Sequence, residues 1–457
     1  MERDNGIVNQ LRRLAWLRYN LIPLPYWYGK EFRKNRAFLE KSQWWSPERI
    51  KEYQWGKLKN LLEHAYKNVP FYQERFKKMG LHPNDIRSFE DFSRIPVLTK
   101  ADLKDNLGKL KAKDFERWQP IETNTGGTTG SPVKLYRSQN SETFRKAVVW
   151  RWQNWAGYFY GDRRIGDRHR FDLNKKRESW YEEYEDRQLT IDSCHLNELS
   201  FKLFVDGFRW YKPKIIYNGN LSFLKLLARY VLNENIEDIK PKAILTLGEA
   251  LSEFDRKFFE STFGCKVFDY YGMRENAVSA YQCEEGNYHM NSEMVLMEFE
   301  KDGKPAPAGQ MAKIIGTNLH NYAFPLIRYN TEDIGYGIDQ RCPCGRNLPL
   351  MKIVGGRSRD FLVTKNGLVT VSHQMPQILG RSLKIDAIQF HQEESNSVVV
   401  KIVPRDGYAK EDESFLIGLL NQLFEDELKI DVEYVEEIPR TPLGKYRFVI
   451  SEIPVEL

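Results

Sequence analysis

Short apolar runs alternate with longer amphipathic segments between about residues 190 and 280. Short apolar runs are typical of buried strands, whereas apolar residues repeated every three to four positions predict helices. The expected strands are 214–217, 243–247 and 266–271, and the expected helices are 221–232 and 253–263. Strands that alternate with helices favour a parallel sheet with crossover connections. Because ligands of such sheets bind beyond the carboxyl ends of the strands, Gly248-Glu249 and Tyr271-Gly272 become site candidates.

The flanking regions predict two other kinds of structure. From Ser46 to about residue 108 the pattern is helical, and from about 290 to 355 strands dominate. After Gly355-Gly356 the chain restarts as a small unit, with strands expected at 387–390, 398–403 and 432–435 and helices at 376–380 and 411–425. We therefore expect an α/β fold. A large multi-layer N-terminal domain with β/α subdomains would span residues 1–357, and a small, mobile α+β C-terminal domain would span 358–457.

Composition narrows the class of protein. The chain has 457 residues, of which 41% are hydrophobic and 29% charged, as expected for a soluble globular protein with more than one domain. A net charge of +6 does not indicate nucleic-acid binding, although it suits an anionic substrate. No apolar run is long enough for a transmembrane helix. Five cysteines, an odd number, favour a reducing, cytoplasmic setting over a disulfide framework.

Two segments have alternative interpretations. Residues 7–27 mix Leu, Ile, Trp and Tyr with arginines, which predicts an amphipathic helix. Such a helix either packs on its own domain or forms a face for peripheral membrane or partner association. Residues 162–177 are dense in charge, which is typical of a solvated loop, and the alternative is a role in holding a polyanionic ligand.

The stretch Thr125-Gly126-Gly127-Thr128-Thr129-Gly130-Ser131-Pro132 has little to bury and many groups that can bind an anion. Glycines allow sharp turns and close approach to a ligand, and exposed N–H groups and hydroxyls can surround a phosphate. The alternative is a flexible linker of small polar residues. The stretch is not a P-loop, because Gly130 is followed by Ser131-Pro132 and not by Gly-Lys-Ser/Thr.

Five other stretches combine turn residues with charge. In chain order they are Gly248-Glu249, Asp269–Glu275, Arg328–Gly335, Gly356–Asp360 and Pro439–Lys445. In the third of these we expect Asp333 just after a strand, and the fourth lies at the expected domain junction. Each stretch alone is typical of a structural turn.

Together and in this order, these stretches resemble the adenylate-forming superfamily of acyl-CoA ligases, peptide-synthetase adenylation domains and luciferases. The resemblance runs from about Ser46 to the C-terminus and is closest to the phenylacetate–CoA ligase branch. Within that branch it is closest to the CapK-like and coenzyme F390 synthetase-like members.

The resemblance implies a role for each residue. The ATP β- and γ-phosphates would be held by Thr125, Gly126, Gly127, Thr128, Thr129 and Gly130. The adenine would lie along Gly248, Glu249, Tyr271 and Gly272. The ribose and phosphate region would be contacted by Asp333 and Arg357. Glu275 would ligate Mg²⁺, Asp360 would be the hinge, and Lys445 would enter the site from the small domain. The attack of a carboxylate on the α-phosphate needs positioning and positive charge more than it needs a proton-transfer base.

The sequence departs from the pattern of the family at several positions. Arg274 stands where a Ser or Thr usually contacts the α-phosphate, and its guanidinium could grip the phosphate or the acyl donor instead. Asn276-Ala277-Val278 replaces the Gly-Pro-rich run of the phenylacetate enzymes, which argues against phenylacetate as the substrate. Glu332 replaces the usual Gly before Asp333, a change that we expect to be minor.

Four residues have the chemistry of a closed zinc shell. They are Cys283, His289, Cys342 and Cys344, with the spacings Cys-x5-His and Cys-Pro-Cys-Gly. Three thiolates and an imidazole would fill a tetrahedral site with no open position, which predicts a structural zinc. The alternative is a set of unrelated buried thiols.

The sequence therefore predicts an ATP- and Mg²⁺-dependent, AMP-forming ligase. It would activate a small-molecule or sugar-linked carboxylate and transfer the acyl group to the thiol of coenzyme A or to an amine, and the resemblance to CapK suggests surface-polysaccharide biosynthesis. The alternative is an inactive protein of the same fold that serves as a scaffold in polysaccharide assembly.

Overall fold

The computed structural model describes residues 28–124, 133–168, 180–183, 187–192, 195–196, 198–248, 251, 253–355, 361–371, 384–439 and 449–453. Its helices are α3 (Gly29–Ser42), α4 (Pro47–Asn68), α5 (Pro70–Met79), α6 (Phe89–Ser93), α7 (Lys100–Asp105), α8 (Gln139–Trp155), α9 (Glu198–Tyr211), α10 (Leu221–Asn233), α11 (Glu253–Phe263) and α13 (Lys410–Phe424). Short 3₁₀ helices occupy Pro83–Asp85 and Phe115–Trp118. None of these described helices is long and apolar enough to cross a membrane.

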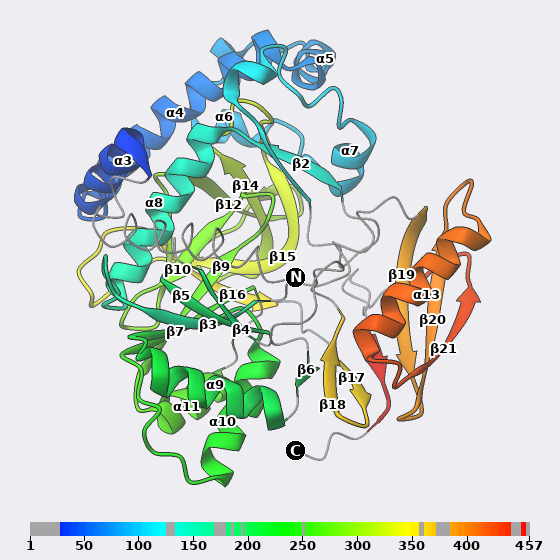
Figure 1. Ribbon diagram of the computed structural model, residues 1–457. Helices are drawn as coiled ribbons and strands as arrows, with labels where there is room; N and C mark the ends of the chain where they lie inside the picture. Colours follow the sequence, from blue (N-terminus) through cyan, green and yellow to red (C-terminus); the bar gives the residue numbers. More distant parts are fainter. Residues whose placement is uncertain are drawn as a thin grey trace, which may run out of the picture.

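A large mixed sheet runs through the main body (Figure 1). In spatial order its strands are β13 (Lys304–Pro305), β12 (Val295–Lys301), β14 (Ala312–Asn318), β15 (Tyr329–Ile338), β16 (Leu350–Gly355), β11 (Tyr288–Met290), β10 (Ser279–Gln282), β9 (Lys266–Gly272), β8 (Ala243–Leu247), β7 (Ile215–Asn218), β3 (Arg164–Arg168), β5 (Gln188–Asp192) and β4 (Trp180–Glu183). The neighbours β5, β3, β7, β8 and β9 are parallel. From β9 towards β13 the pairing is antiparallel. The predicted parallel sheet is therefore present, as one part of a mixed sheet.

The central strands β7 and β8 are buried on both faces, which explains their largely apolar sequences. Ile244 packs with α9, α10 and α11 on one face, whereas its neighbours Ala243 and Leu245 pack with α3 and α8 on the other. Helices α9, α10 and α11 (green) lie together at the bottom of Figure 1, and α3, α4 and α8 (blue to cyan) lie at its upper left. A third cluster joins α4 and α5 to Leu296, Phe324 and Tyr329.

Helix α4 begins as the sequence predicts. The Ser46 hydroxyl accepts a hydrogen bond from the Arg49 amide at 3.3 Å, and Pro47 occupies the first turn, where its missing N–H costs nothing. Leu58, Leu61 and Leu62 then lie on the buried face, at the helical spacing visible in the sequence.

The C-terminal part forms a smaller group of elements, at the right of Figure 1. Its sheet has the order β21 (Lys429–Tyr434), β20 (Ser397–Pro404), β19 (Ile385–Gln392) and β22 (Val449–Ser451), and α13 packs on it. These elements agree with the predicted small α+β unit. The hairpin of β17 (Phe361–Thr364) and β18 (Gly367–Thr370) precedes them, and β18 also pairs with β6 (His195–Leu196).

Part of the charged segment 162–177 is not a solvated loop. Arg164–Arg168 forms β3 inside the large sheet, and Arg164 and Asp167 are buried. Distant partners make this burial favourable, because the Asp167 carboxylate accepts the Gly219 amide at 2.7 Å and the Arg164 guanidinium lies 4.5 Å from the centre of the Tyr217 ring. The segment 7–27, the expected helix at 376–380 and residues 169–177 lie outside the described residues.

Candidate active site and metal centre

The ends of β8 and β9 place the predicted adenine residues. Gly248 follows β8 directly, with a φ of 87° that favours glycine. Gly272 ends β9, and a Cβ at this position would lie 2.6 Å from ring atoms of Tyr270. Larger residues would therefore displace the Tyr270 ring. Glycine thus suits the backbone conformation at position 248 and the close approach of the Tyr270 ring at position 272.

Tyr271 and Asp333 are 62 residues apart in the chain, and the fold brings them into contact. The Tyr271 hydroxyl donates a hydrogen bond to the Asp333 carboxylate, with 3.1 Å between the two oxygens. The predicted adenine residue and the predicted ribose residue thus lie at one place.

The expectation that Asp333 follows a strand is wrong, because Asp333 lies within β15 (Tyr329–Ile338). The pairing of β15 with β14 shifts register between Lys313 and Ile315, so the segment around Asp333 bulges out of the ladder. The Thr331 hydroxyl stabilises the bulge, since it donates to the Ile314 carbonyl at 2.8 Å and accepts the Asp333 amide at 3.1 Å. A bulge re-aims side chains, which explains how a residue inside a strand reaches Tyr271.

Glu332 matters more to the bulge than the sequence suggested. Its φ is 64°, in the left-handed region where a side chain is strained. This backbone conformation explains why a glycine suits the position. The Glu332 carboxylate lies 2.8 Å from the Lys100 Nζ, an ion pair that ties α7 to the bulge and offsets part of the strain.

Glu275 lies in the turn that follows β9. The Asn276 amide donates to the Met273 carbonyl at 3.0 Å, and Asn276 takes a φ of 59°, which asparagine tolerates better than most residues. The Asn318 side chain donates to the Asn276 carbonyl at 2.7 Å. Behind the turn, a Cβ on Gly316 would lie 2.3 Å from the Ala277 oxygen, so only glycine allows this close approach.

Two buried carboxylates near this turn differ in their partners. Asp269 is satisfied by the hydroxyls of Thr246, at 2.6 Å, and Tyr288, and its burial raises its pKa. Glu275 is 7% exposed, and within the described residues its carboxylate accepts no hydrogen bond. A largely buried carboxylate is suited to binding a cation, and oxygen ligands are those that Mg²⁺ prefers. The Glu275 position therefore fits the predicted magnesium ligand.

Arg274, just before Glu275, is close to a second arginine. Its pKa is lowered, first by partial burial and then by the positive charge of Arg137, while Glu275 acts in the opposite direction. The two guanidinium groups give this side of the turn a positive character. An anionic substrate would be attracted to it.

The other predicted site residues lie outside the described part of the chain. They are Thr125, Gly126, Gly127, Thr128, Thr129, Gly130, Glu249, Arg357, Asp360 and Lys445. Their roles stay predictions.

The four predicted zinc ligands come together beside the neighbouring strands β10, β11 and β16. One ligand atom from each of Cys283, His289, Cys342 and Cys344 lies within 4.8 Å of the others. The sulfurs of Cys283 and Cys342 are 3.5 Å apart, near the spacing of about 3.8 Å that two thiolates have in a tetrahedral zinc site. The geometry fits a zinc ion, although zinc itself stays a prediction.

The groups around this cluster would support a metal. The Nδ1 of His289 lies 3.2 Å from the Leu348 carbonyl, which requires Nδ1 to carry the hydrogen. Its Nε2 then faces the Cys344 sulfur at 3.3 Å with a free lone pair. Burial lowers the pKa of His289 to about 4, so the imidazole is neutral at pH 7. The Asn287 side chain donates to the Cys342 sulfur at 3.3 Å.

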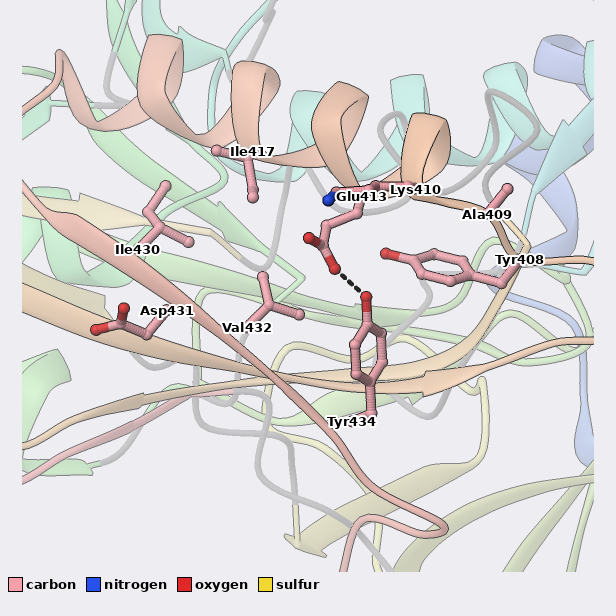
Figure 2. Close-up of a pocket in the computed structure, with 9 residues that line it drawn as sticks. All are labelled: Tyr408, Ala409, Lys410, Glu413, Ile417, Ile430, Asp431, Val432 and Tyr434. Atoms are coloured by element: carbon pink, nitrogen blue, oxygen red, sulfur yellow. Dashed lines mark hydrogen bonds between the residues drawn. The ribbon is translucent and has the colours of Figure 1, made fainter.

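An open hollow of about 590 Å³ lies in the C-terminal part, between α13 and β21 (Figure 2). In Figure 2 the hydroxyl of Tyr434 points to the carboxylate of Glu413, and Tyr408 lies beside them. None of its lining residues belongs to the predicted motifs. Charged residues along an edge strand such as β21 protect it from pairing with other chains, so its acidic groups have a structural explanation.

Similarity to known proteins agrees with this arrangement. Residues 362–452 match the CapK C-terminal domain family. The chain is 26% identical over 415 residues to protein CapK of Staphylococcus aureus, covering 88% of this chain and 89% of the relative. It is also 26% identical over 359 residues to a phenylacetate-coenzyme A ligase of Pseudomonas putida, covering 76% and 79%. These similarities support the predicted resemblance to the adenylate-forming superfamily. Within it, the chain is phenylacetate–CoA ligase-like and CapK-like.

The fold of the chain is also similar to that of a solved ligase. The chain aligns with 2-hydroxyisobutyryl-CoA ligase in complex with an acyl-adenylate, with a TM-score of 0.57 and 18% identity over 90% of this chain and 93% of that one. At this identity the likeness concerns the fold alone. It agrees with the predicted α/β fold with a C-terminal domain.

Sequence reasoning missed Arg137 as a residue near the site. It lies five positions after Pro132, at the end of β2 (Lys134–Arg137), and its side chain reaches the Arg274 carbonyl. The sequence carries no local signal for this contact, because the two residues are 137 positions apart.

Proposed function

We propose that this protein is an ATP-dependent, AMP-forming ligase that activates a carboxylate as an acyl-adenylate and transfers the acyl group to the thiol of coenzyme A. The relatives named phenylacetate-coenzyme A ligase support the class of reaction. The departures after Glu275 argue for another carboxylate than phenylacetate.

The observation that carries the proposal is the convergence at the end of β9. The Tyr271 hydroxyl contacts the Asp333 carboxylate, and the buried Glu275 follows Tyr271 by four positions. An aromatic ring beside a carboxylate suits a nucleoside, whose base can stack and whose ribose hydroxyls can donate to Asp333. A carboxylate beyond them suits the metal that accompanies the phosphates.

The residues of the chain would act mainly by binding and orientation. Joining a carboxylate to the α-phosphate brings negative charges together, so positive groups around the reacting atoms lower the barrier. Mg²⁺ bound at Glu275 would supply such charge. Arg274 stands where the family usually has a hydroxyl, and its guanidinium would hold the α-phosphate or the acyl carboxylate. Lys445 would supply a further positive charge from the small domain.

Two versions of this function differ in the molecule that accepts the acyl group. Coenzyme A is the acceptor named for the phenylacetate relatives. A CapK-like protein could instead use the amine of a sugar or amino acid, which would place the reaction in surface-polysaccharide assembly. Both versions share the acyl-adenylate, and they differ only in the second step.

We also propose that Cys283, His289, Cys342 and Cys344 bind a structural zinc. The support is the closed donor set, the neutral His289 and the hydrogen bonds to Leu348 and from Asn287. The donor set leaves no open position for a substrate. The zinc would therefore fix the loops around β11 and β16 and take no part in the reaction.

A single assay tests the first step. The purified protein is incubated with ATP, Mg²⁺ and a panel of carboxylic acids, with hydroxylamine to trap the activated acyl group, and pyrophosphate release is followed. We expect release that depends on one class of acid and falls by about 10²–10³-fold or more in Lys445→Ala. Exposed Lys429→Ala is the matched control and should keep full activity.

The outcomes also judge the alternative of an inactive scaffold. If no acid supports pyrophosphate release and ATP does not bind, the ligase proposal is wrong and the scaffold remains. If release occurs, adding coenzyme A or an amino sugar in place of hydroxylamine identifies the acceptor by the product that forms.

A further inference from the structure

Arg137 connects the strand that follows the Gly/Thr stretch to the turn that carries Glu275. It is the last residue of β2, which pairs with β1 (Ile121–Asn124), and these two strands flank residues 125–132. Its Nε and Nη2 both donate to the carbonyl oxygen of Arg274, at 3.2 Å and 2.7 Å. The Arg137 side chain is 16% exposed, and its two bonds to the Arg274 carbonyl lie at the solvent-accessible side of the turn.

Two donors on one carbonyl fix more than a distance. The carbonyl of Arg274 and the amide of Glu275 belong to the same planar peptide group. A guanidinium fork that holds the oxygen from two nitrogens therefore restrains the rotation of this plane. The Cα of Glu275 lies in this plane, so the position of the atom that carries its side chain is restrained as well.

A buried carboxylate compensates the charge of Arg137. The third donor of Arg137, Nη1, lies 3.0 Å from the Glu142 carboxylate in the first turn of α8. Arg145 holds the same carboxylate with two bonds, at 2.9 Å and 2.6 Å. Against the effect of burial, these two arginines lower the pKa of Glu142 to about 2. Glu142 is therefore ionised at neutral pH and anchors the Arg137 fork in place.

The Arg137 guanidinium has a different role from that of an arginine that binds a phosphate. Each of its three nitrogens already donates to a carbonyl or a carboxylate, and part of its charge is balanced by Glu142, which Arg145 shares. A lysine would keep the charge but has no planar fork, so it could not hold the carbonyl from two directions. The geometry of the guanidinium, more than its charge, is what the site uses.

We propose that Arg137 is a positioning residue for Glu275, and that it couples the strand after the phosphate-binding stretch to the metal-binding carboxylate. This inference rests on the proposed function, in which Glu275 ligates the metal. It assigns Arg137 a role that no motif of the superfamily resemblance gives it. Groups that orient a metal ligand typically change metal affinity by about 10–100-fold when they are removed.

The test measures metal binding without turnover. Mn²⁺ replaces Mg²⁺, α,β-methylene-ATP replaces ATP, and the free Mn²⁺ is counted by electron paramagnetic resonance with the full-length protein. We expect Arg137→Lys to weaken Mn²⁺ binding about 10-fold or more, with a smaller change in the affinity for the nucleotide alone. Arg145→Lys is the matched control. It disturbs the same Glu142 carboxylate, and among the described contacts it has no bond to the Arg274 carbonyl, so Mn²⁺ affinity should stay near that of the wild type.

The outcomes separate this inference from the proposed function. If the wild type does not bind Mn²⁺ with the nucleotide, both the magnesium role of Glu275 and the role of Arg137 are wrong. If the wild type binds and Arg137→Lys binds equally well, the proposed function stands and the positioning role is wrong. If both lysine variants weaken Mn²⁺ equally, Glu142 and not the carbonyl contact is responsible, which also contradicts the inference. Thermal unfolding of each variant shows that the protein compared is folded. Arg137→Gln, which loses both the fork and the charge, should weaken Mn²⁺ at least as much as Arg137→Lys.

Discussion

The ion pair between Arg151 and Glu293 offers a sharp test of what holds the large part together. Arg151 on α8 is 1% exposed and Glu293 is fully buried. The guanidinium donates to both carboxylate oxygens, at 2.6 Å and 3.3 Å, to the Leu39 carbonyl and to the Asn291 side chain. The Ser42 hydroxyl donates to the same carboxylate at 2.6 Å. One pair thus joins α3, α8 and the segment before β12.

Arg151→Met should destabilise the protein strongly, because it keeps much of the volume but leaves the Glu293 charge buried. Removing one partner of a buried pair typically costs about 3–5 kcal/mol. For a cooperative unit of roughly 330 residues, this cost lowers the melting temperature by about 4–7 °C. The double variant Arg151→Met/Glu293→Leu removes both charges, and such replacements are often nearly neutral, so it should recover at least half of the loss.

Differential scanning calorimetry and urea unfolding followed by tryptophan fluorescence measure these changes. Trp152, which follows Arg151 in the sequence, is fully buried and contributes to this signal. Lys67→Met is the matched control, because its pair with Glu63 spans 3.6 Å at the surface and both side chains are at least half exposed. A cost of Arg151→Met below about 1 kcal/mol, or a double variant as unstable as the single one, would refute the reasoning.

Three further predictions follow from the candidate site. Elemental analysis of protein purified without added metal should find about one zinc per chain, and Cys342→Ser should lose it while Cys265→Ser, outside the cluster, keeps it. Zinc retained by Cys342→Ser would contradict the site. Asp333→Asn should raise KM for ATP by about 10–100-fold, because a hydrogen bond to a charged group contributes about 1.5–3 kcal/mol, whereas exposed Asp339→Asn should not. Equal values for the two variants would contradict the ribose role. The pKa of Glu142 is lowered to about 2 from its usual 4.5, so its contribution of about 3 kcal/mol is fully present above about pH 4.5 and is lost as the pH falls towards 2. Unfolding of Glu142→Gln between these pH values should depend less on pH than that of the wild type, and an unchanged dependence would contradict the shift.

The elements that the sequence predicts well are those whose pattern is visible within a short stretch of residues. The strand 243–247 and the helix 253–263 coincide with β8 and α11, because an apolar run buried on both faces and an amphipathic repeat are each visible in a short window. The strand Arg164–Arg168 was not predicted. Its charged residues are buried by partners from other elements, such as the Gly219 amide, and a short window cannot contain them.

In the candidate site, too, some features are visible in the sequence and others depend on contacts between distant segments. The spacing of Cys342 and Cys344, with Cys283 and His289 upstream, predicts a cluster, and the fold brings all four together. Asp333 was expected just after a strand but lies within β15, at a bulge. The bulge depends on how β15 pairs with β14, which the sequence of β15 alone does not contain. No pattern in either strand marks where two paired strands lose register.

The site lies where the sheet changes from parallel to antiparallel pairing. Strand β9 pairs in parallel with β8 and antiparallel with β10, so the chain after β9 turns back on itself instead of entering a crossover helix. The turn at Glu275 therefore receives no support from a helix of its own. Three distant groups hold it instead: the Arg137 fork, the Asn318 side chain and the close packing at Gly316. Because these supports come from segments on both sides of the turn in the sequence, changes in any of them should alter metal binding before they alter the stability of β9. This difference would distinguish residues that build the site from residues that build the sheet.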